Sequence, residues 1–172
     1  TDLSILNEVR EKTEGIIDTL HRSDIGQKVK PRTYRKRARK DYLAVAKKRR
    51  PTRKAIRKAI GKQLRYIDRN LRSISKLAGG PLQGRLGLLG RRKYRNLLVA
   101  QEVYRQQKQM YDARSHSVPD RIVSVSQPHV RPIVRGKASA PVEFGAKISV
   151  SKIGRFAFLD RLSWDAYNES VD

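Results

Sequence analysis

The most regular hydrophobic pattern in the chain lies between residues 54 and 77. Apolar side chains recur there at steps of three or four residues, which is the spacing of one face of an α-helix. These positions are Ile56, Ile60, Leu64, Ile67, Leu71, Ile74 and Leu77. Because the steps approach a heptad repeat, they predict a helix of about seven turns with a coiled-coil-like seam. Five basic side chains fall off the seam and leave the other side positive: Lys58, Lys62, Arg65, Arg69 and Arg72.

Three other segments also show helical periodicity. Residues 3–20 and 91–114 carry apolar side chains on one side, and residues 33–49 predict a basic helix with a narrow apolar face. Glycine and proline residues separate these segments. The simplest arrangement is an antiparallel pair formed by residues 54–77 and 91–114, with the other helices packed alongside. A homo-oligomer that associates through the seam is the alternative.

After Pro119 the hydrophobic period changes from that of a helix to that of a strand. Residues 122–125 predict a short strand, followed by an extended basic loop that reaches residue 137. Residues 142–150 alternate strictly between apolar and polar, which predicts a strand with one buried face. Residues 156–162 predict the returning strand of a hairpin. Two strands alone are barely stable, so we expect the sheet to need further strands and the chain to be an internal fragment.

The charge of the chain is large and unevenly distributed. There are 40 Lys and Arg against 16 Asp and Glu, a formal net charge of +24. Residues 28–65 hold 18 of the basic side chains and a single acid, Asp41. Such a field attracts a polyanion, because phosphate contacts by Lys and Arg release condensed counterions. We therefore expect a nucleic acid, and DNA in particular, as the partner.

The candidate DNA-binding residues follow from this distribution. In the basic region they are Arg32, Arg35, Lys36, Arg37, Arg39, Lys40, Lys47, Lys48, Arg49, Arg50, Arg53 and Lys54. In the extended loop they are Arg131, Arg135 and Lys137. Tyr34 and Tyr42 lie among basic residues and either stack on bases or pack on the neighbouring helix.

Several classes of function are excluded or disfavoured by composition. The chain has no Cys, which excludes a disulfide scaffold, a thiol nucleophile and Cys-based metal sites. The three histidines are too scattered for a zinc site. No apolar run approaches the roughly 20 residues of a membrane span. We expect a cytoplasmic protein without a membrane partner or a small-molecule substrate.

Stretches along essentially the whole chain carry a resemblance to a known family, and those after residue 125 are the most specific. The most specific stretches are SQPHVRPIVRGKA (126–138), PVEFGAKISV (141–150) and LSWDAYNE (162–169). Together they resemble the middle of a bacterial insertion-sequence transposase. These transposases belong to the DDE class and have an RNase H-like core. The opening TDLSILNE resembles the segment after their first catalytic strand, and residues 32–50 and 54–77 match their helical insertion.

The resemblance implies an α+β fold with two parts. Residues 1–115 would be the mostly helical, basic insertion, and residues 116–172 a partial RNase H-like core containing an antiparallel β-hairpin. The implied partner is DNA at transposon ends. The implied chemistry is two-metal cleavage and strand transfer, with Mg²⁺ bound by three carboxylates.

The resemblance also implies that the catalytic triad lies outside this chain. None of its carboxylates matches the catalytic motif, including Asp120, Asp160, Asp165, Glu169 and Asp172. We therefore expect no catalytic residue, no metal ligand and no enzymatic activity of the chain alone, with Mg²⁺ needed only by the complete enzyme. The alternative is a self-contained basic RNA- or DNA-binding protein without catalytic activity.

Overall fold

The structure is a computed structural model that describes residues 2–22, 29–78, 83–134 and 142–164. Its internal contacts divide the chain into two units, Thr1–Pro119 and Asp120–Asp172. Both helices and antiparallel strands are present, so the chain is α+β as predicted. No helix among these residues is long and apolar enough to cross a membrane.

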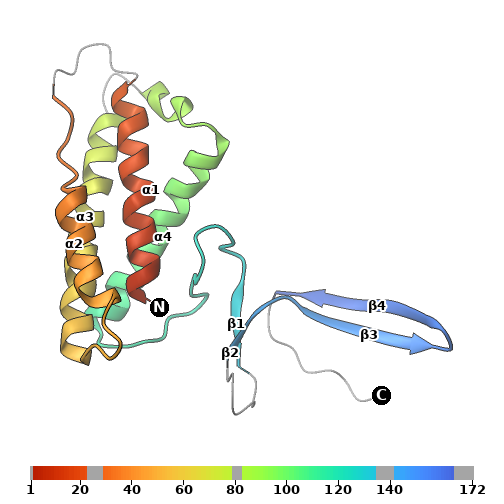
Figure 1. Ribbon diagram of the computed structural model, residues 1–172. Coiled ribbons are helices and arrows are strands. Elements are labelled where there is room, and N and C mark those ends of the chain that lie inside the picture. The colour runs from red at the N-terminus through yellow and green to blue at the C-terminus, as the bar shows by residue number, and fades with distance from the viewer. Residues whose placement is uncertain (1, 23–28, 79–82, 135–141, 165–172) are drawn as a thin grey trace. The chain divides into compact units, whose positions relative to one another are not determined.

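The first unit is a bundle of helices that run in alternating directions along the chain (Figure 1). Its elements are α1 (Asp2–Arg22), α2 (Arg35–Ala46), α3 (Arg53–Ala78), the 3₁₀ helix η1 (Gln83–Leu88) and α4 (Arg91–Asp112). α1 and α3 each contact all of the other α-helices, and they pack most extensively against one another. The expected antiparallel neighbours α3 and α4 are in contact, but the main partner of α3 is α1.

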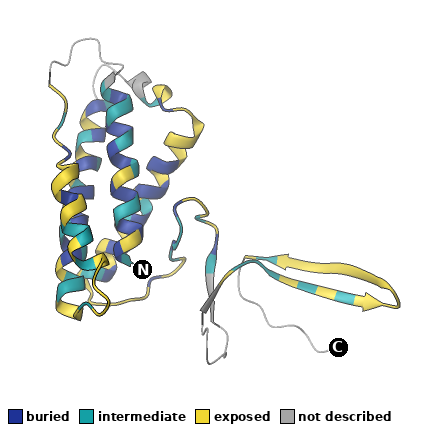
Figure 2. Cartoon of the chain, in the orientation of Figure 1, coloured by how far each residue is buried: buried dark blue, intermediate teal, exposed yellow. Residues whose placement is uncertain are grey.

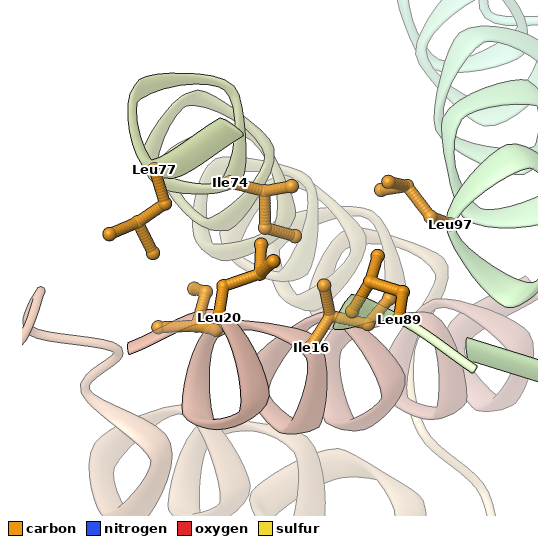
Figure 3. Packing of buried hydrophobic residues seen from close by; sticks show 7 residues of the cluster. Ile16, Leu20, Ile74, Leu77, Leu89 and Leu97 are labelled. Carbon is orange, nitrogen blue, oxygen red and sulfur yellow. The ribbon is translucent and has the colours of Figure 1, made fainter. Parts of the chain in front are cut away.

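One cluster of the apolar core joins α1 and α3 to the residues around the start of α4. It contains Ile16, Ile17, Leu20, Ile74, Leu77, Leu89 and Leu97 (Figure 3). The buried side chains follow the inner faces of the helices, and the exposed ones follow the outer faces (Figure 2). Each amphipathic helix of the bundle therefore has a partner for its apolar face.

The buried face of α3 includes polar positions that are not part of the predicted seam. Gln63 and Asn70, one heptad apart, are fully buried, whereas the seam residues Ile56, Ile60 and Leu71 are only partly buried. Both amides have partners on other helices: Asn70 Nδ2 donates to Thr13 Oγ1 at 3.0 Å, and Gln63 Nε2 donates to the carbonyl of Ala38 at 3.0 Å. The buried face is thus partly polar, and its polar members connect α3 to α1 and α2.

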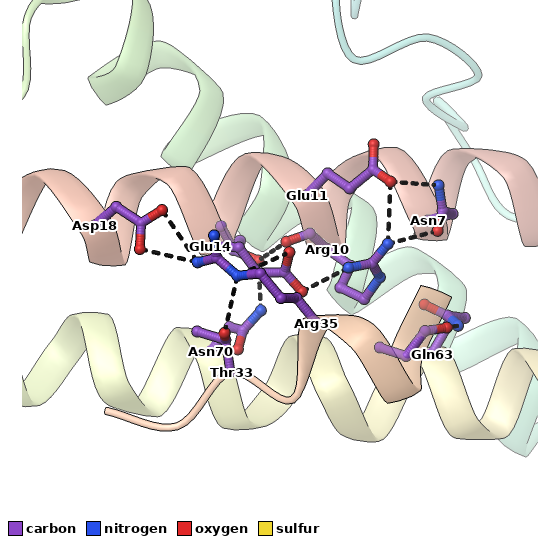
Figure 4. Close-up of polar contacts among 11 residues, drawn as sticks. Asn7, Arg10, Glu11, Glu14, Asp18, Thr33, Arg35, Gln63 and Asn70 are labelled. Atoms are coloured by element: carbon purple, nitrogen blue, oxygen red, sulfur yellow. Dashed lines mark hydrogen bonds and ion pairs between the residues drawn. The ribbon is translucent and has the colours of Figure 1, made fainter. Parts of the chain in front are cut away.

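A buried ion pair lies in the same part of the bundle. Arg10 is 1% exposed and donates through Nη1 to Glu14 Oε1 at 2.5 Å and through Nη2 to Asn7 Oδ1 at 2.7 Å (Figure 4). Burial raises the pKa of the Glu14 carboxyl, and the hydrogen bond from Arg10 opposes that rise. A buried pair of this kind needs both members, because either charge alone would be uncompensated.

Among its described residues, the second unit contains two separate two-stranded antiparallel sheets. β1 (Arg131–Val134) pairs with β2 (Val142–Gly145), and β3 (Lys147–Ile153) pairs with β4 (Phe156–Ser163). The predicted β3–β4 hairpin is confirmed, but the predicted strand 142–150 is wrong as a single element. Gly145, at φ 156°, ends β2, and each half of the run pairs with a different strand.

Two further predictions in this unit need correction. Residues 122–125 form no strand, although Ile122 and Val125 are buried. The stretch before residue 137 that was predicted to be an extended loop contains β1, which includes Pro132. Proline can occupy a strand that lacks a neighbour on its N–H side, and within the described ranges β1 pairs with β2 alone.

The β3–β4 hairpin contains a β-bulge that sets the direction of its side chains. Ser149 pairs with Arg161 and Val150 pairs with Leu159, so Asp160 is the extra residue. In a regular strand Leu159 and Leu162 would lie on opposite faces, since they are three residues apart. The bulge places both on the face of Val150 and Ile148. These apolar side chains are nevertheless exposed, Leu159 at 63%.

Candidate nucleic-acid interface

α2 is held on the bundle by a narrow strip of contacts and presents its basic side chains outward. Ala38 is its only buried residue, and its carbonyl accepts the hydrogen bond from Gln63. At 100° per residue, Lys36 and Lys40 fall on the side opposite Ala38, and Arg39 lies beside them. All three are exposed, as the narrow apolar face of this segment predicts.

One predicted contact residue on α2 has a structural role instead. Arg35 Nη2 lies 2.8 Å and 3.0 Å from the two carboxylate oxygens of Asp18, and its Nε donates to Thr33 Oγ1 at 3.3 Å (Figure 4). Partial burial would raise the pKa of Asp18, but hydrogen bonds from Arg35 and Lys30 outweigh it and lower the pKa. Arg35 therefore fastens the start of α2 to α1.

The turn after α2 continues the exposed basic series into the first residues of α3. We use "basic segment" for the nine exposed side chains Lys36, Arg39, Lys40, Lys47, Lys48, Arg49, Arg50, Arg53 and Lys54. The described residues supply no carboxylate within ion-pair distance of any of them. Arg32, just before α2, is also exposed. The predicted basic region thus remains available to an external anion.

The cations in the middle of α4 are neutralised locally, in contrast to the basic segment. Arg105 lies 2.6 Å from Glu102, three residues earlier, and Lys108 pairs with Asp112, four residues later. The hydrogen bond from Arg105 lowers the pKa of the Glu102 carboxyl. Arg105 and Lys108 therefore have carboxylate partners on their own helix, which the side chains of the basic segment lack within the described ranges.

A second group of basic side chains lines a groove between α2 and α3. The groove has a volume of about 290 Å³ and is lined by Tyr34, Arg37, Asp41, Lys62, Arg65, Tyr66 and Arg69. Sequence reasoning placed Lys62, Arg65 and Arg69 off the seam but did not group them with α2. The available signal was their spacing of three and four residues, which aligns them on one face of α3.

Asp41 organises one side of this groove. It accepts hydrogen bonds from Lys62 Nζ at 2.5 Å and from Tyr66 Oη at 2.9 Å. Partial burial would raise the pKa of the Asp41 carboxyl, but these two hydrogen bonds outweigh it and lower the pKa. Burial and the hydrogen bond to Asp41 raise the pKa of Tyr66. The only carboxylate lining the groove is therefore ionised and has two partners.

Of the two tyrosines predicted to stack or pack, Tyr34 remains accessible. It is 43% exposed, and the guanidinium carbon of Arg69 lies 4.6 Å from its ring centroid. Tyr42 is partly buried. Only Tyr34 therefore lies at the rim of the groove with a substantial part of its side chain in solvent.

The one predicted basic residue of the second unit that the structure describes, Arg131, is less available to an external anion than the basic segment is. Arg131 Nη1 donates to the carbonyl of Pro128 at 2.5 Å, and its side chain is 27% exposed. Its guanidinium therefore already contacts the chain's own backbone. Arg135 and Lys137 lie outside the described residues.

The carboxylates that the structure describes do not gather at one point. Within the described ranges, no three His, Asp or Glu side chains come close enough together to hold a metal ion. Asp160 accepts a hydrogen bond from Ser151 at 2.9 Å in the exposed hairpin. Asp165, Glu169 and Asp172 lie outside those ranges.

Comparisons with known proteins identify no relative: no protein-family model, curated protein or solved structure matches this chain significantly.

Proposed function

We propose that the helical unit binds DNA through the basic segment. The observation that carries this proposal is the run of nine exposed Lys and Arg side chains that have no carboxylate partner among the residues described. Unpaired like charges repel one another and lower stability unless an anion compensates them. A polyanion with closely spaced phosphates is the partner that such a series fits best.

The dimensions of α2 suit a DNA backbone. With 12 residues, α2 is about 18 Å long. Over that distance duplex DNA presents about ten phosphate charges. Lys36 and Lys40 lie one turn apart on the outward side of α2, so both can contact the same backbone. Binding of this kind depends steeply on salt and hardly on base sequence.

We further propose that this DNA binding serves a DDE transposase, with the second unit as part of its RNase H-like core. The support is the resemblance of the stretches 126–138, 141–150 and 162–169 to those transposases. The exposed apolar side chains of β3 and β4 add to it, because a hairpin of this kind needs additional strands or helices to cover it. The chain would bind and position transposon DNA, and carboxylates outside it would hold the Mg²⁺ ions.

The experiment that tests DNA binding compares two double variants of equal charge. Lys36→Gln/Lys40→Gln removes two unpaired cations, and Arg105→Gln/Lys108→Gln removes two that are already paired. Binding to a labelled DNA duplex is measured by fluorescence anisotropy over a range of salt concentrations. We expect the slope of log affinity against log salt to fall by about two for the α2 variant and to change little for the α4 variant.

Equal losses in both double variants would show that only net charge matters and would overturn the assignment of the basic segment. Incubation of the unaltered chain with plasmid DNA and Mg²⁺ tests the other part of the proposal. We expect no cleavage above a protein-free blank, and robust cleavage would show that the active site lies in this chain.

A further inference from the structure

The groove between α2 and α3 holds more positive charge than its own carboxylate neutralises. Four cations and one acid line it, and Asp41 is engaged by Lys62 and by Tyr66. Arg37, Arg65 and Arg69 remain, and of these Arg37 is near enough to Asp41 to contribute to its lowered pKa. Neither Arg65 nor Arg69 has an ion-pair partner in the part of the chain that the structure describes.

Three guanidinium groups around one small groove indicate the chemistry of the ligand. Arg presents a planar fork of N–H donors that matches the oxygens of a phosphate, and it is preferred over Lys where such an anion is held in a fixed orientation. The volume of about 290 Å³ is at the lower limit of small-ligand sites. There is room for about one nucleotide and not for a base pair.

Tyr34 adds an aromatic surface to the rim of the groove. Its φ of 54° is left-handed, which is uncommon for a bulky residue and costs energy. The residue sits at the N-cap of α2, but its side chain makes no capping hydrogen bond. The ring lies against the Arg69 guanidinium, and both side chains line the groove.

We propose that this groove binds a single unpaired nucleotide of a DNA strand, with Arg37, Arg65 and Arg69 around the phosphate and Tyr34 stacked on the base. The inference rests on the proposed DNA binding and names the form of DNA that the groove selects. In a duplex both faces of each base are covered by neighbouring bases. A base in a single strand can instead stack on an aromatic side chain.

The test compares a labelled single-stranded oligonucleotide of about 12 nucleotides with a duplex of the same length. Tyr34→Asn removes the ring, and Asn tolerates the left-handed backbone, so the start of α2 is preserved. We expect Tyr34→Asn to weaken single-strand binding about tenfold and duplex binding less than twofold. Tyr34→Phe keeps the ring and should bind both probes as the unaltered protein does.

Matched controls exist for both the ring and the charge. Tyr94, 42% exposed on α4, is the counterpart of Tyr34, so Tyr94→Asn should leave single-strand binding unchanged. Arg72 lies two turns beyond Arg65 on the same side of α3 and is 2.7 Å from Asp68. Arg65→Gln should therefore weaken single-strand binding more than Arg72→Gln does.

The two proposals fail in different ways. Equal effects of Tyr34→Asn and Tyr94→Asn, or equal losses on single strand and duplex, would overturn the nucleotide site and leave DNA binding by the basic segment intact. Circular dichroism of each variant establishes that the helices are unchanged. Absence of binding to either probe by the unaltered protein would overturn the proposed function itself.

Discussion

The helical bundle buries its apolar side chains, whereas the β3–β4 hairpin leaves them exposed. Leu20 and Ile67 in the bundle are fully buried, whereas Phe156 and Leu159 in the hairpin are 65% and 63% exposed. Both regions follow the hydrophobic period of their secondary structure. The difference is that each helix of the bundle packs against at least two others, whereas each strand of the hairpin has one neighbour.

This comparison shows which part of the molecule is stabilised by its own contacts. Burial of apolar area is the main favourable contribution to folding, and the apolar side chains of the bundle are buried. The bundle even accommodates a buried Arg10–Glu14 pair in its interior. The hairpin gains only cross-strand contacts, which contribute less than about 1 kcal/mol each. Substitutions of similar chemistry should therefore have large effects in the bundle and small ones in the hairpin.

The largest difference in stability between a bundle variant and a hairpin variant is expected when an arginine is replaced. Arg10→Met leaves the Glu14 carboxylate buried without its main partner and should lower the free energy of unfolding by about 3–5 kcal/mol. Arg155→Met, at the exposed end of the hairpin, should change it by less than about 0.5 kcal/mol. Urea denaturation measures both variants, followed by the helical circular dichroism signal for Arg10→Met and by the fluorescence of Trp164, next to β4, for Arg155→Met.

The double variant Arg10→Met/Glu14→Leu separates the cost of an unpaired charge from loss of packing. Replacing both members of a buried pair by apolar residues is often neutral or stabilising, so the double variant should recover most of the lost stability. A double variant as unstable as Arg10→Met would mean that the pair is not what makes Arg10 important.

Truncation of an apolar side chain should show the same contrast at a smaller scale. Ile67→Ala creates a cavity at a fully buried position and should cost about 2–5 kcal/mol. Leu159→Ala removes a side chain that is already largely in solvent and should cost less than about 0.5 kcal/mol. The midpoints of urea denaturation compare the two variants directly. Similar losses would mean that the hairpin is covered in solution by another surface.

The sequence predicts the bundle better than the strands because helical periodicity is a local signal. The long period in α3 predicts a helix and four of its buried residues, which are Leu64, Ile67, Ile74 and Leu77. It does not predict that Gln63 and Asn70 are buried, because their partners, the Ala38 carbonyl and Thr13, lie on other helices. The burial of a polar side chain depends on such distant partners, which a single segment does not reveal.

The strands were harder to predict because alternation does not identify the partner strand. Residues 142–150 alternate without interruption, yet β2 and β3 pair with different strands on either side of Ala146. In the candidate site, the charge run predicts the basic segment. The groove joins α2 to positions on α3 that lie about 25 residues away in the chain, as Asp41 and Tyr66 show, and only the packing of the two helices brings them together.

The smallest expected effect is on the pH dependence of stability, which should change when an acid of the bundle is replaced and not when an acid of the hairpin is replaced. The pKa of Asp41 is lowered in the folded state, so its contribution to stability is present above its unfolded pKa, about 4, and is lost as the pH falls through the folded pKa. Asp41→Asn should cost up to about 1 kcal/mol at pH near 7, and the difference should vanish at low pH. Asp160→Asn in the hairpin is the matched control and should leave the midpoint of urea denaturation unchanged at either pH. A pH-independent loss in Asp41→Asn would show that the carboxylate charge is not what joins α2 to Lys62 and Tyr66.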